Sequence, residues 1–209
     1  MRYTDVESNS DLNSVPHLKI EDFAQKITPK ISISDLVLPA NEKKMLYNII
    51  CNARGKLKVY EERGFAEKRS DRGLGLILLF LGDSRTGKRM AAEALANELK
   101  LNLFKVDLSV IVRRYIGEIE KILQRLFDDC KADNALLFFD EADALFRKRT
   151  KVRDSHDRYS NIGIDHTLRE IEAYRGLAIL SLSTNMKISS DSAFTRRIRF
   201  VVTFSDSQK

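Results

Sequence analysis

Short apolar runs alternate with longer amphipathic segments over most of the chain. Leu76 to Leu81 is continuously apolar, and Ala135 to Phe139 and Leu177 to Leu182 have nearly the same character. Runs of this kind are typical of strands that are covered on both faces of a sheet. Two further short strands are expected from Leu101 to Val106 and from Phe200 to Phe204. The pattern therefore predicts five strands.

Amphipathic segments between these runs predict helices. The clearest has apolar residues at i, i+3, i+4, i+7 and i+8, which form a single stripe: Ile119, Ile122, Leu123, Leu126 and Phe127. Other helices are expected to start near Asn41, to run from Arg89 to Leu99 and to run from Asp157 to Tyr174. Strands that alternate with helices predict a parallel sheet with helices on both faces. The fold class is therefore α/β.

The chain divides into three parts by pattern. Residues 1–30 are polar without a sustained period, and we expect them to form a flexible N-terminal arm. Residues 31–72 contain a few apolar positions before Pro39 and then one helix, so they are expected to form a linker and helix. Residues 73–209 carry the alternating strands and helices and form the core of one domain.

Composition is that of an ordinary intracellular domain. The chain is 43% hydrophobic and 32% charged, and no apolar run approaches the roughly 18 residues of a membrane helix. The first residues lack a hydrophobic signal segment, so a cytoplasmic location is expected. Cys51 and Cys130 form no C-x-x-C pair and predict neither a disulfide framework nor a zinc site.

The net charge of +6 raises the question of nucleic-acid binding. The basic residues are densest between 147 and 153, where five of the seven residues are Lys or Arg. No aromatic residues are interleaved with them to stack on bases, and no reading helix is evident. A solvated loop is therefore favoured over a nucleic-acid patch, and we do not expect nucleic acid to be a partner.

A phosphate-binding loop is predicted directly after the first apolar strand. Its G-x-x-x-x-G-K spacing is formed by Gly82, Asp83, Ser84, Arg85, Thr86, Gly87 and Lys88. Between a strand and a helix, the two glycines let backbone N–H groups face phosphates, and the helix dipole adds to the attraction. Lys88 would reach the β and γ phosphates of a nucleotide, which indicates ATP. The alternative, a coincidental glycine-lysine turn, is disfavoured by this placement.

Two acids follow the next predicted buried strand. Asp140 and Glu141 stand at the end of Ala135 to Phe139, about fifty residues after the phosphate-binding loop. Asp140 would hold Mg²⁺ through its water shell, and Glu141 would orient or deprotonate an attacking water. Paired acids at a strand end can equally form a solvated turn, but their position after such a loop favours the catalytic interpretation.

These motifs together resemble the ATPase domain of the AAA (AAA+) family. The similarity spans Ile31 to Phe204 and is specific because five segments occur in the right order. They are Gly87–Ala96, Tyr115–Glu118, Phe139–Phe146, Asp154–Tyr159 and Glu172–Leu177. The group most similar in these segments comprises bacterial ATP-binding AAA proteins, some associated with contractile injection systems. The resemblance implies a P-loop NTPase with a three-layer α/β/α arrangement and a five-stranded parallel sheet.

The resemblance also implies roles for residues outside the loop. Asn185 would sense the γ-phosphate and position the water, although it could instead be a structural cap. Arg196 and Arg197, with Arg199 as a further candidate, match the arginine-finger segment that completes a neighbour's site in a homo-oligomeric ring. Tyr115 resembles the pore-loop aromatic that grips a substrate polypeptide. A solvated basic edge and a partly exposed hydrophobic residue are the respective alternatives.

Several positions depart from the family pattern. Arg89 stands where a Ser or Thr hydroxyl would bind Mg²⁺, so metal binding should weaken. Arg85 and Asp83 replace an expected glycine and proline. The chain ends soon after the last predicted strand, so we expect the helical lid of this family to be missing. Two functions follow: Mg²⁺-dependent ATP hydrolysis that remodels protein partners, or a degenerate nucleotide-binding assembly subunit with little hydrolysis.

Overall fold

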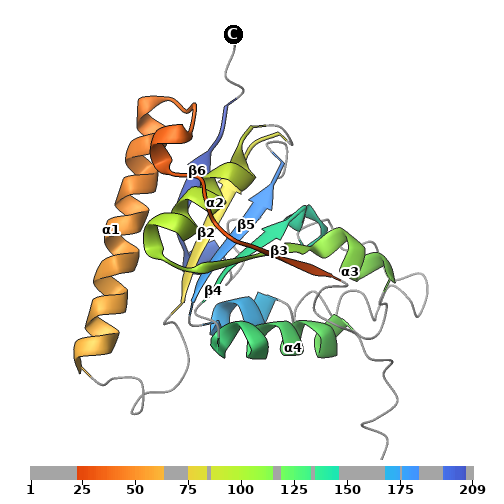
Figure 1. Cartoon of the computed structure of the whole chain (residues 1–209). Helices are drawn as coiled ribbons and strands as arrows, with labels where there is room; N and C mark the ends of the chain where they lie inside the picture. Colours follow the sequence, from red (N-terminus) through yellow and green to blue (C-terminus); the bar gives the residue numbers. More distant parts are fainter. Residues whose placement is uncertain are drawn as a thin grey trace, which may run out of the picture.

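The computed structural model describes residues 23–63, 75–83, 86–114, 119–132, 135–145, 168–174, 176–183 and 195–205. They form a six-stranded sheet with helices on both faces (Figure 1). The strands are β1 (Ala24–Ile27), β2 (Leu76–Leu81), β3 (Asn102–Asp107), β4 (Ala135–Asp140), β5 (Leu177–Leu182) and β6 (Ile198–Thr203). The α-helices are α1 (Ala40–Arg63), α2 (Lys88–Leu99), α3 (Leu108–Arg114) and α4 (Ile119–Ala132). Short 3-10 turns are η2 (Ile33–Asp35), η4 (Ala142–Leu145) and η5 (Thr195–Arg197), and residues 168–173 are helical.

The strand order is β1-β3-β4-β5-β2-β6. The five strands from β2 to β6 run parallel to their neighbours, and only the β1–β3 pair is antiparallel. The expected parallel α/β sheet is therefore confirmed, with one strand more than the five that were predicted. Because the strands are parallel, the segments that follow β2, β4 and β5 all emerge at the same edge of the sheet, where ligands of open α/β sheets bind.

Strand β1 corrects the expected extent of the flexible arm. Residues 24–27 pair with β3, with Ala24 opposite Val106 and Ile27 opposite Leu103. Phe23 and Ala24 are buried against the core, whereas Gln25 and Lys26 are exposed. A four-residue edge strand with two polar residues leaves no detectable period in the sequence. Residues 1–22 lie outside the described part of the chain.

Alternate strand residues build two separate core layers. Leu76, Leu78 and Phe80 of β2 pack with α1 and α2 on one face of the sheet. Ile77 and Leu79 pack on the other face, where α3, α4 and the helix at 168–173 lie. Successive side chains of a strand point to opposite faces, so a sheet covered on both sides needs apolar residues at every position. This explains why the predicted strands read as unbroken apolar runs.

Several element boundaries follow the predictions closely. Helix α1 begins directly after Pro39, α2 begins one residue before the predicted start, and β5 has the predicted bounds. Strand β6 begins two residues earlier than expected, and the seven-residue helix α3 was not predicted. The helix expected from Asp157 to Tyr174 is described only from residue 168. In the described part of the chain, no helix has the length and apolar character needed to cross a membrane.

Candidate nucleotide site

The predicted phosphate-binding loop joins β2 to α2 at the edge where the parallel strands end. Gly82 donates its N–H to the Leu182 carbonyl at 3.1 Å, which ties the start of the loop to the end of β5. A Cβ on Gly82 would lie 2.6 Å from Thr86 Oγ1 and 2.7 Å from the Phe204 carbonyl oxygen. Glycine is therefore required here by the close approach of the chain. Ser84 and Arg85, both predicted to contact phosphate, lie outside the described residues.

The second half of the loop is shaped by Thr86 and Gly87. The Thr86 hydroxyl and N–H both donate to the Asp83 carbonyl, at 2.8 Å and 3.2 Å, and close a turn. Gly87 then caps α2 with a left-handed backbone, φ 82°. A side chain at this φ costs on the order of 1–2 kcal/mol, so glycine suits the position. Asp83 itself is exposed.

Lys88 is the buried cation of the site. Its side chain is only 9% exposed, and its Nζ donates to the carbonyl oxygens of Gly82 and Leu182, the latter at 2.9 Å. Burial lowers the pKa of Lys88 below its ordinary 10.5, while the carboxylates of Asp140, Asp143 and Asp83 oppose this shift. Neutral carbonyls do not cancel the ammonium charge. A positive charge therefore stands beside the first turn of α2, where an anion would bind.

Asp140 and Glu141 occupy the end of β4 at the same edge. Asp140 Oδ1 accepts the Glu141 N–H at 3.1 Å, and Asp140 Oδ2 lies 3.1 Å from Lys105 Nζ. Glu141 is exposed and has a left-handed backbone, φ 51°. For a residue with a Cβ this conformation costs on the order of 1–2 kcal/mol, and such strain is found preferentially at functional sites. Its carboxylate is thus presented to solvent directly beside Asp140.

Asp143 is a site residue that the sequence did not single out. It lies in η4 and accepts hydrogen bonds from the Ser183 hydroxyl at 2.5 Å and from the Ser183 N–H at 3.2 Å. Ser183 follows β5 and precedes Asn185, the predicted sensor, by two residues. The contact therefore joins the acidic turn after β4 to the segment that leads to the predicted sensor. Asn185 and the predicted pore-loop residue Tyr115 are outside the described residues.

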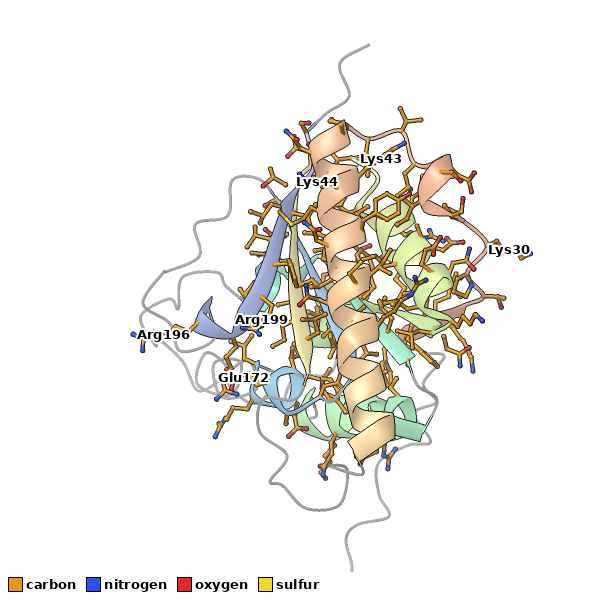
Figure 2. The ribbon with its side chains drawn as sticks, turned by 90° about the vertical axis from the view of Figure 1, so that its left-hand side faces the viewer. Lys30, Lys43, Lys44, Glu172, Arg196 and Arg199 are labelled. Carbon is orange, nitrogen blue, oxygen red and sulfur yellow. The ribbon has the colours of Figure 1, made fainter. Side chains whose placement is uncertain are left out.

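The three arginines of the predicted finger segment differ in their surroundings. Arg197, at the end of η5, forms an ion pair with Glu172 of the helix at 168–173, with Nη1 and Oε2 3.3 Å apart. Arg196 and Arg199 are exposed, and Figure 2 shows the Arg196 side chain pointing away from the sheet. All three lie at the amino end of β6, whereas Lys88 follows the carboxyl end of β2. Parallel β2 and β6 therefore place them at opposite edges of the sheet.

The described residues do not form a complete Mg²⁺ site. Arg89 provides no oxygen and its side chain is exposed, and both oxygens of Asp140 already have a partner. The described part of the chain contains no group of three or more His, Cys, Asp or Glu residues that could hold a metal ion. Magnesium prefers an octahedral set of oxygen ligands. At nucleotide sites most of these oxygens come from phosphates and waters, and the protein supplies one or two. Here a cation stands at position 89 and Asp140 is ion-paired, and these two residues are what does not fit the metal.

The arrangement of loop, buried lysine and acidic strand end agrees with a comparison to protein families. Residues 78–206 match the family described as ATPase family associated with various cellular activities (AAA), which is more than half of the chain. The chain belongs to the AAA family of ATPases. The resemblance inferred from the sequence motifs is thereby confirmed, and the P-loop α/β fold with it.

Relatives of known sequence support the same family. The uncharacterized AAA family ATPase y4kL of Sinorhizobium fredii is 31% identical over 183 residues, which are 88% of this chain and 52% of that protein. Proteasome-activating nucleotidase 2 of Halobacterium salinarum is 34% identical over 126 residues, 59% of this chain and 31% of the nucleotidase. The chain thus spans about half the length of the first relative and less of the second.

Solved AAA domains share the fold. The AAA domain of FIGL-1 in complex with ADP has a TM-score of 0.61 and 21% identity, and the match covers 90% of this chain and 63% of the other. A second crystal structure of the FIGL-1 AAA domain gives a TM-score of 0.65 at 18% identity, covering 95% of this chain and 64% of the other. At these identities the likeness concerns the fold alone.

Proposed function

We propose that this AAA domain binds ATP at the carboxyl edge of its sheet. The observation that carries the proposal is Lys88, a buried ammonium that contacts only neutral carbonyls in its described hydrogen bonds and stands at the start of α2. On binding, Lys88 Nζ would exchange the carbonyls of Gly82 and Leu182 for phosphate oxygens. The loop N–H groups and the dipole of α2 would add to the attraction. Binding of ADP by the FIGL-1 AAA domain is consistent with this assignment.

Glu141 is the residue that we propose for the hydrolytic step. Its left-handed backbone turns the carboxylate out of the strand and into solvent beside Asp140. A carboxylate in this position can orient a water and accept its proton. Asp143 would support the step through its hydrogen bond to Ser183, which directly follows β5. This bond would fix the segment that leads to Asn185, two residues further on.

The arginine segment is proposed to act on a neighbouring subunit. Each parallel strand spans about six residues at roughly 3.3 Å per residue, so the arginines and Lys88 are separated by about 20 Å along the sheet. No arginine side chain can bridge that separation within one chain. The ion pair with Glu172 occupies Arg197. Arg196 is therefore the better candidate for the finger, with Arg199 as the next. The finger would act in a homo-oligomeric ring that remodels a protein partner.

A second candidate function is an assembly subunit that binds nucleotide with little hydrolysis. Arg89 and the Lys105–Asp140 ion pair favour it, because together they remove the hydroxyl and engage the carboxylate that would hold Mg²⁺. Both functions share ATP binding through Lys88. They differ in whether the bound ATP is hydrolysed with the help of Glu141.

The experiment combines nucleotide titration with phosphate release for the wild type, Lys88→Met and Glu141→Gln. Lys88→Met is expected to weaken ATP binding by tenfold or more, about 1.4 kcal/mol or greater, because a charge-assisted hydrogen bond is lost. Glu141→Gln should bind ATP as the wild type does but release no phosphate. Lys44→Met, which removes an exposed lysine of α1 (Figure 2), is the matched control. Unchanged binding in Lys88→Met would contradict the proposal, and wild-type release equal to buffer would favour the second function.

A further inference from the structure

Lys105 lies beside the acidic carboxyl end of β4, where it forms an ion pair with Asp140. It is on β3, where Lys105 pairs with Phe138 of β4 and Asp107 pairs directly with Asp140. Residues two apart on a strand share a face, so Lys105, Asp107 and Asp140 all point to the same side of the sheet. Leu103 and Phe138 of that side pack in the core layer that contains α2. Lys105 therefore lies on the same face as the helix that carries Lys88.

The pairing of Asp107 with Asp140 places two carboxylates opposite each other. Like charges in direct cross-strand pairs destabilise a sheet unless they are compensated. Asp107 Oδ1 accepts hydrogen bonds from the Ser109 hydroxyl at 2.7 Å and the Val110 N–H at 3.1 Å, so it caps α3. Asp140 has no comparable set of dipoles in the described structure. It has one backbone N–H, from Glu141, and the ammonium of Lys105.

The Lys105–Asp140 pair is close and partly shielded from solvent. Nζ and Oδ2 are 3.1 Å apart, and the two side chains are only 26% and 31% exposed. A pair in this setting is screened less by salt than one on the open surface. Lys105 thus supplies a positive charge at the carboxylate that would otherwise face a metal ion, and position 89 supplies a second cation where a metal-binding hydroxyl is expected.

We propose that Lys105 is a tethered counter-cation of Asp140, so that this domain binds ATP without Mg²⁺. The inference rests on the proposed ATP binding through Lys88 and concerns the cation requirement of the same site. With Lys105 in place, Asp140 does not repel the phosphates and needs no metal to neutralise it. Removing Lys105 leaves Asp140 without its ion-pair partner, so that more of its negative charge acts on the phosphates, and binding then depends on an added divalent cation.

The test is a titration of the full chain with ATP, in EDTA and in excess Mg²⁺. For the wild type the two dissociation constants are expected to agree within about twofold. For Lys105→Met the constant in EDTA should rise about tenfold, while the constant in Mg²⁺ stays near that of the wild type. Lys105→Arg keeps the charge and should behave as the wild type. Lys44→Met, at an exposed position of α1, is the control for loss of a positive charge elsewhere.

Each outcome decides between a counter-cation and a merely structural ion pair. A wild type that binds ATP only with Mg²⁺ would overturn the inference, and this measurement does not depend on the folding of any variant. An equal change of both constants in Lys105→Met, or no change in a folded variant, would also overturn it. Absence of ATP binding by the wild type in both conditions would instead refute the proposed function, and this inference with it.

Discussion

Lys88 and Arg89 are neighbours in the chain but have opposite surroundings. Lys88 is buried against the ends of β2 and β5, whereas Arg89 is exposed on the first turn of α2. Successive residues of an α-helix are rotated by about 100°, so only one of the two can face the sheet. The cation of Arg89 stands at a helix N-terminus, where positive charge is unfavourable. Its place in the loop pattern suggests that a hydroxyl there would restore metal binding.

Replacing Arg89 with Thr is therefore expected to raise Mg²⁺-dependent phosphate release. One recovered interaction with a charged partner corresponds to roughly a tenfold gain, about 1.4 kcal/mol. The removal of a cation from the start of α2 should also stabilise the domain by about 0.3–1 kcal/mol. Phosphate release in Mg²⁺ and in EDTA, together with urea unfolding, measures both effects.

The exposed residue Lys44 on α1 provides the control for this change. Lys44→Thr removes one exposed positive charge outside the loop pattern and should leave phosphate release unchanged. If Arg89→Thr binds ATP but releases no more phosphate than the wild type, Arg89 is not the residue that limits hydrolysis.

At the scale of elements, Tyr174 links the helix at 168–173 to the start of β4 and to α4. It ends the helix at 168–173, and its hydroxyl donates to the Ala135 carbonyl, at the start of β4, at 2.6 Å. Its ring packs against Phe127 of α4, with centroids 5.7 Å apart. A Cβ on Gly75 would lie 1.9 Å from the Tyr174 carbonyl oxygen, and one on Gly176 would lie 2.6 Å from the tyrosine ring. Both glycines therefore permit the close packing around Tyr174.

Tyr174→Phe is expected to destabilise the domain at neutral pH and less so at alkaline pH. Loss of the buried hydrogen bond to the Ala135 carbonyl costs about 1–3 kcal/mol. Burial raises the pKa of Tyr174 well above its ordinary 10.0. Above pH 10 the unfolded tyrosine releases its proton more readily than the folded one, so the tyrosine's stabilisation is full below pH 10 and falls as pH rises further. Urea unfolding at pH 7, 9 and 10.5 measures the difference between the two proteins.

Tyr47, on the solvent side of α1, is the matched control because it is 53% exposed. Tyr47→Phe should change the free energy of unfolding by less than about 0.5 kcal/mol at each pH. A stability difference between wild type and Tyr174→Phe that stays constant up to pH 10.5 would contradict the role of burial at Tyr174.

For the whole molecule, the important feature is that the proposed nucleotide site and the arginine segment lie at opposite ends of the parallel strands. Lys88, Asp140 and Glu141 lie at the carboxyl edge, and Arg196 lies at the amino edge, in η5 directly before β6. In a head-to-tail ring two different surfaces of the subunit meet, and we propose that the amino edge of one subunit faces the carboxyl edge of the next. In such a ring each hydrolytic site would need Glu141 from one chain and Arg196 from another.

Mixing two inactive variants tests this division. Glu141→Gln and Arg196→Ala are each expected to lose phosphate release while they retain ATP binding. In an equimolar mixture about a quarter of the head-to-tail contacts join an intact Glu141 to an intact Arg196. Release should therefore recover to about a quarter of that of the wild type in the same assay.

Arg197→Ala is the comparison variant in this experiment, because Arg197 is ion-paired with Glu172 and is not the proposed finger. Arg197→Ala removes the contact with Glu172, which is partly exposed and worth about 0–1 kcal/mol, so it should affect stability slightly. Loss of phosphate release in Arg197→Ala alone, with release retained in Arg196→Ala alone, would assign the finger to Arg197. If Glu141→Gln is mixed with the inactive arginine variant and no release is recovered, in assembled rings whose wild type is active, action between subunits is contradicted.

Most elements could be predicted from the sequence because their signals are local. The apolar runs of β2, β4 and β5 and the stripe of α4 each report burial within a few residues of themselves. Strand β1 gave no such signal, since its residues gain their place only by pairing with β3, nearly eighty residues away. Helix α3 was not predicted because it is short and follows β3 without a break. Asp107 both ends β3 and caps α3, so the sequence shows no separate start signal for the helix.

The sequence by itself determined the family, the position of the G-x-x-x-x-G-K loop between β2 and α2 and the position of the two acids at the end of β4, because these depend on residue type and spacing along one short segment. Tertiary structure decided which charges meet. Lys105 reaches Asp140, Asp143 holds Ser183, and Arg197 is occupied by Glu172 only because strand register and helix packing bring distant segments together. Electrostatic interactions depend on distance and burial, which spacing along the chain does not encode for residues on different elements.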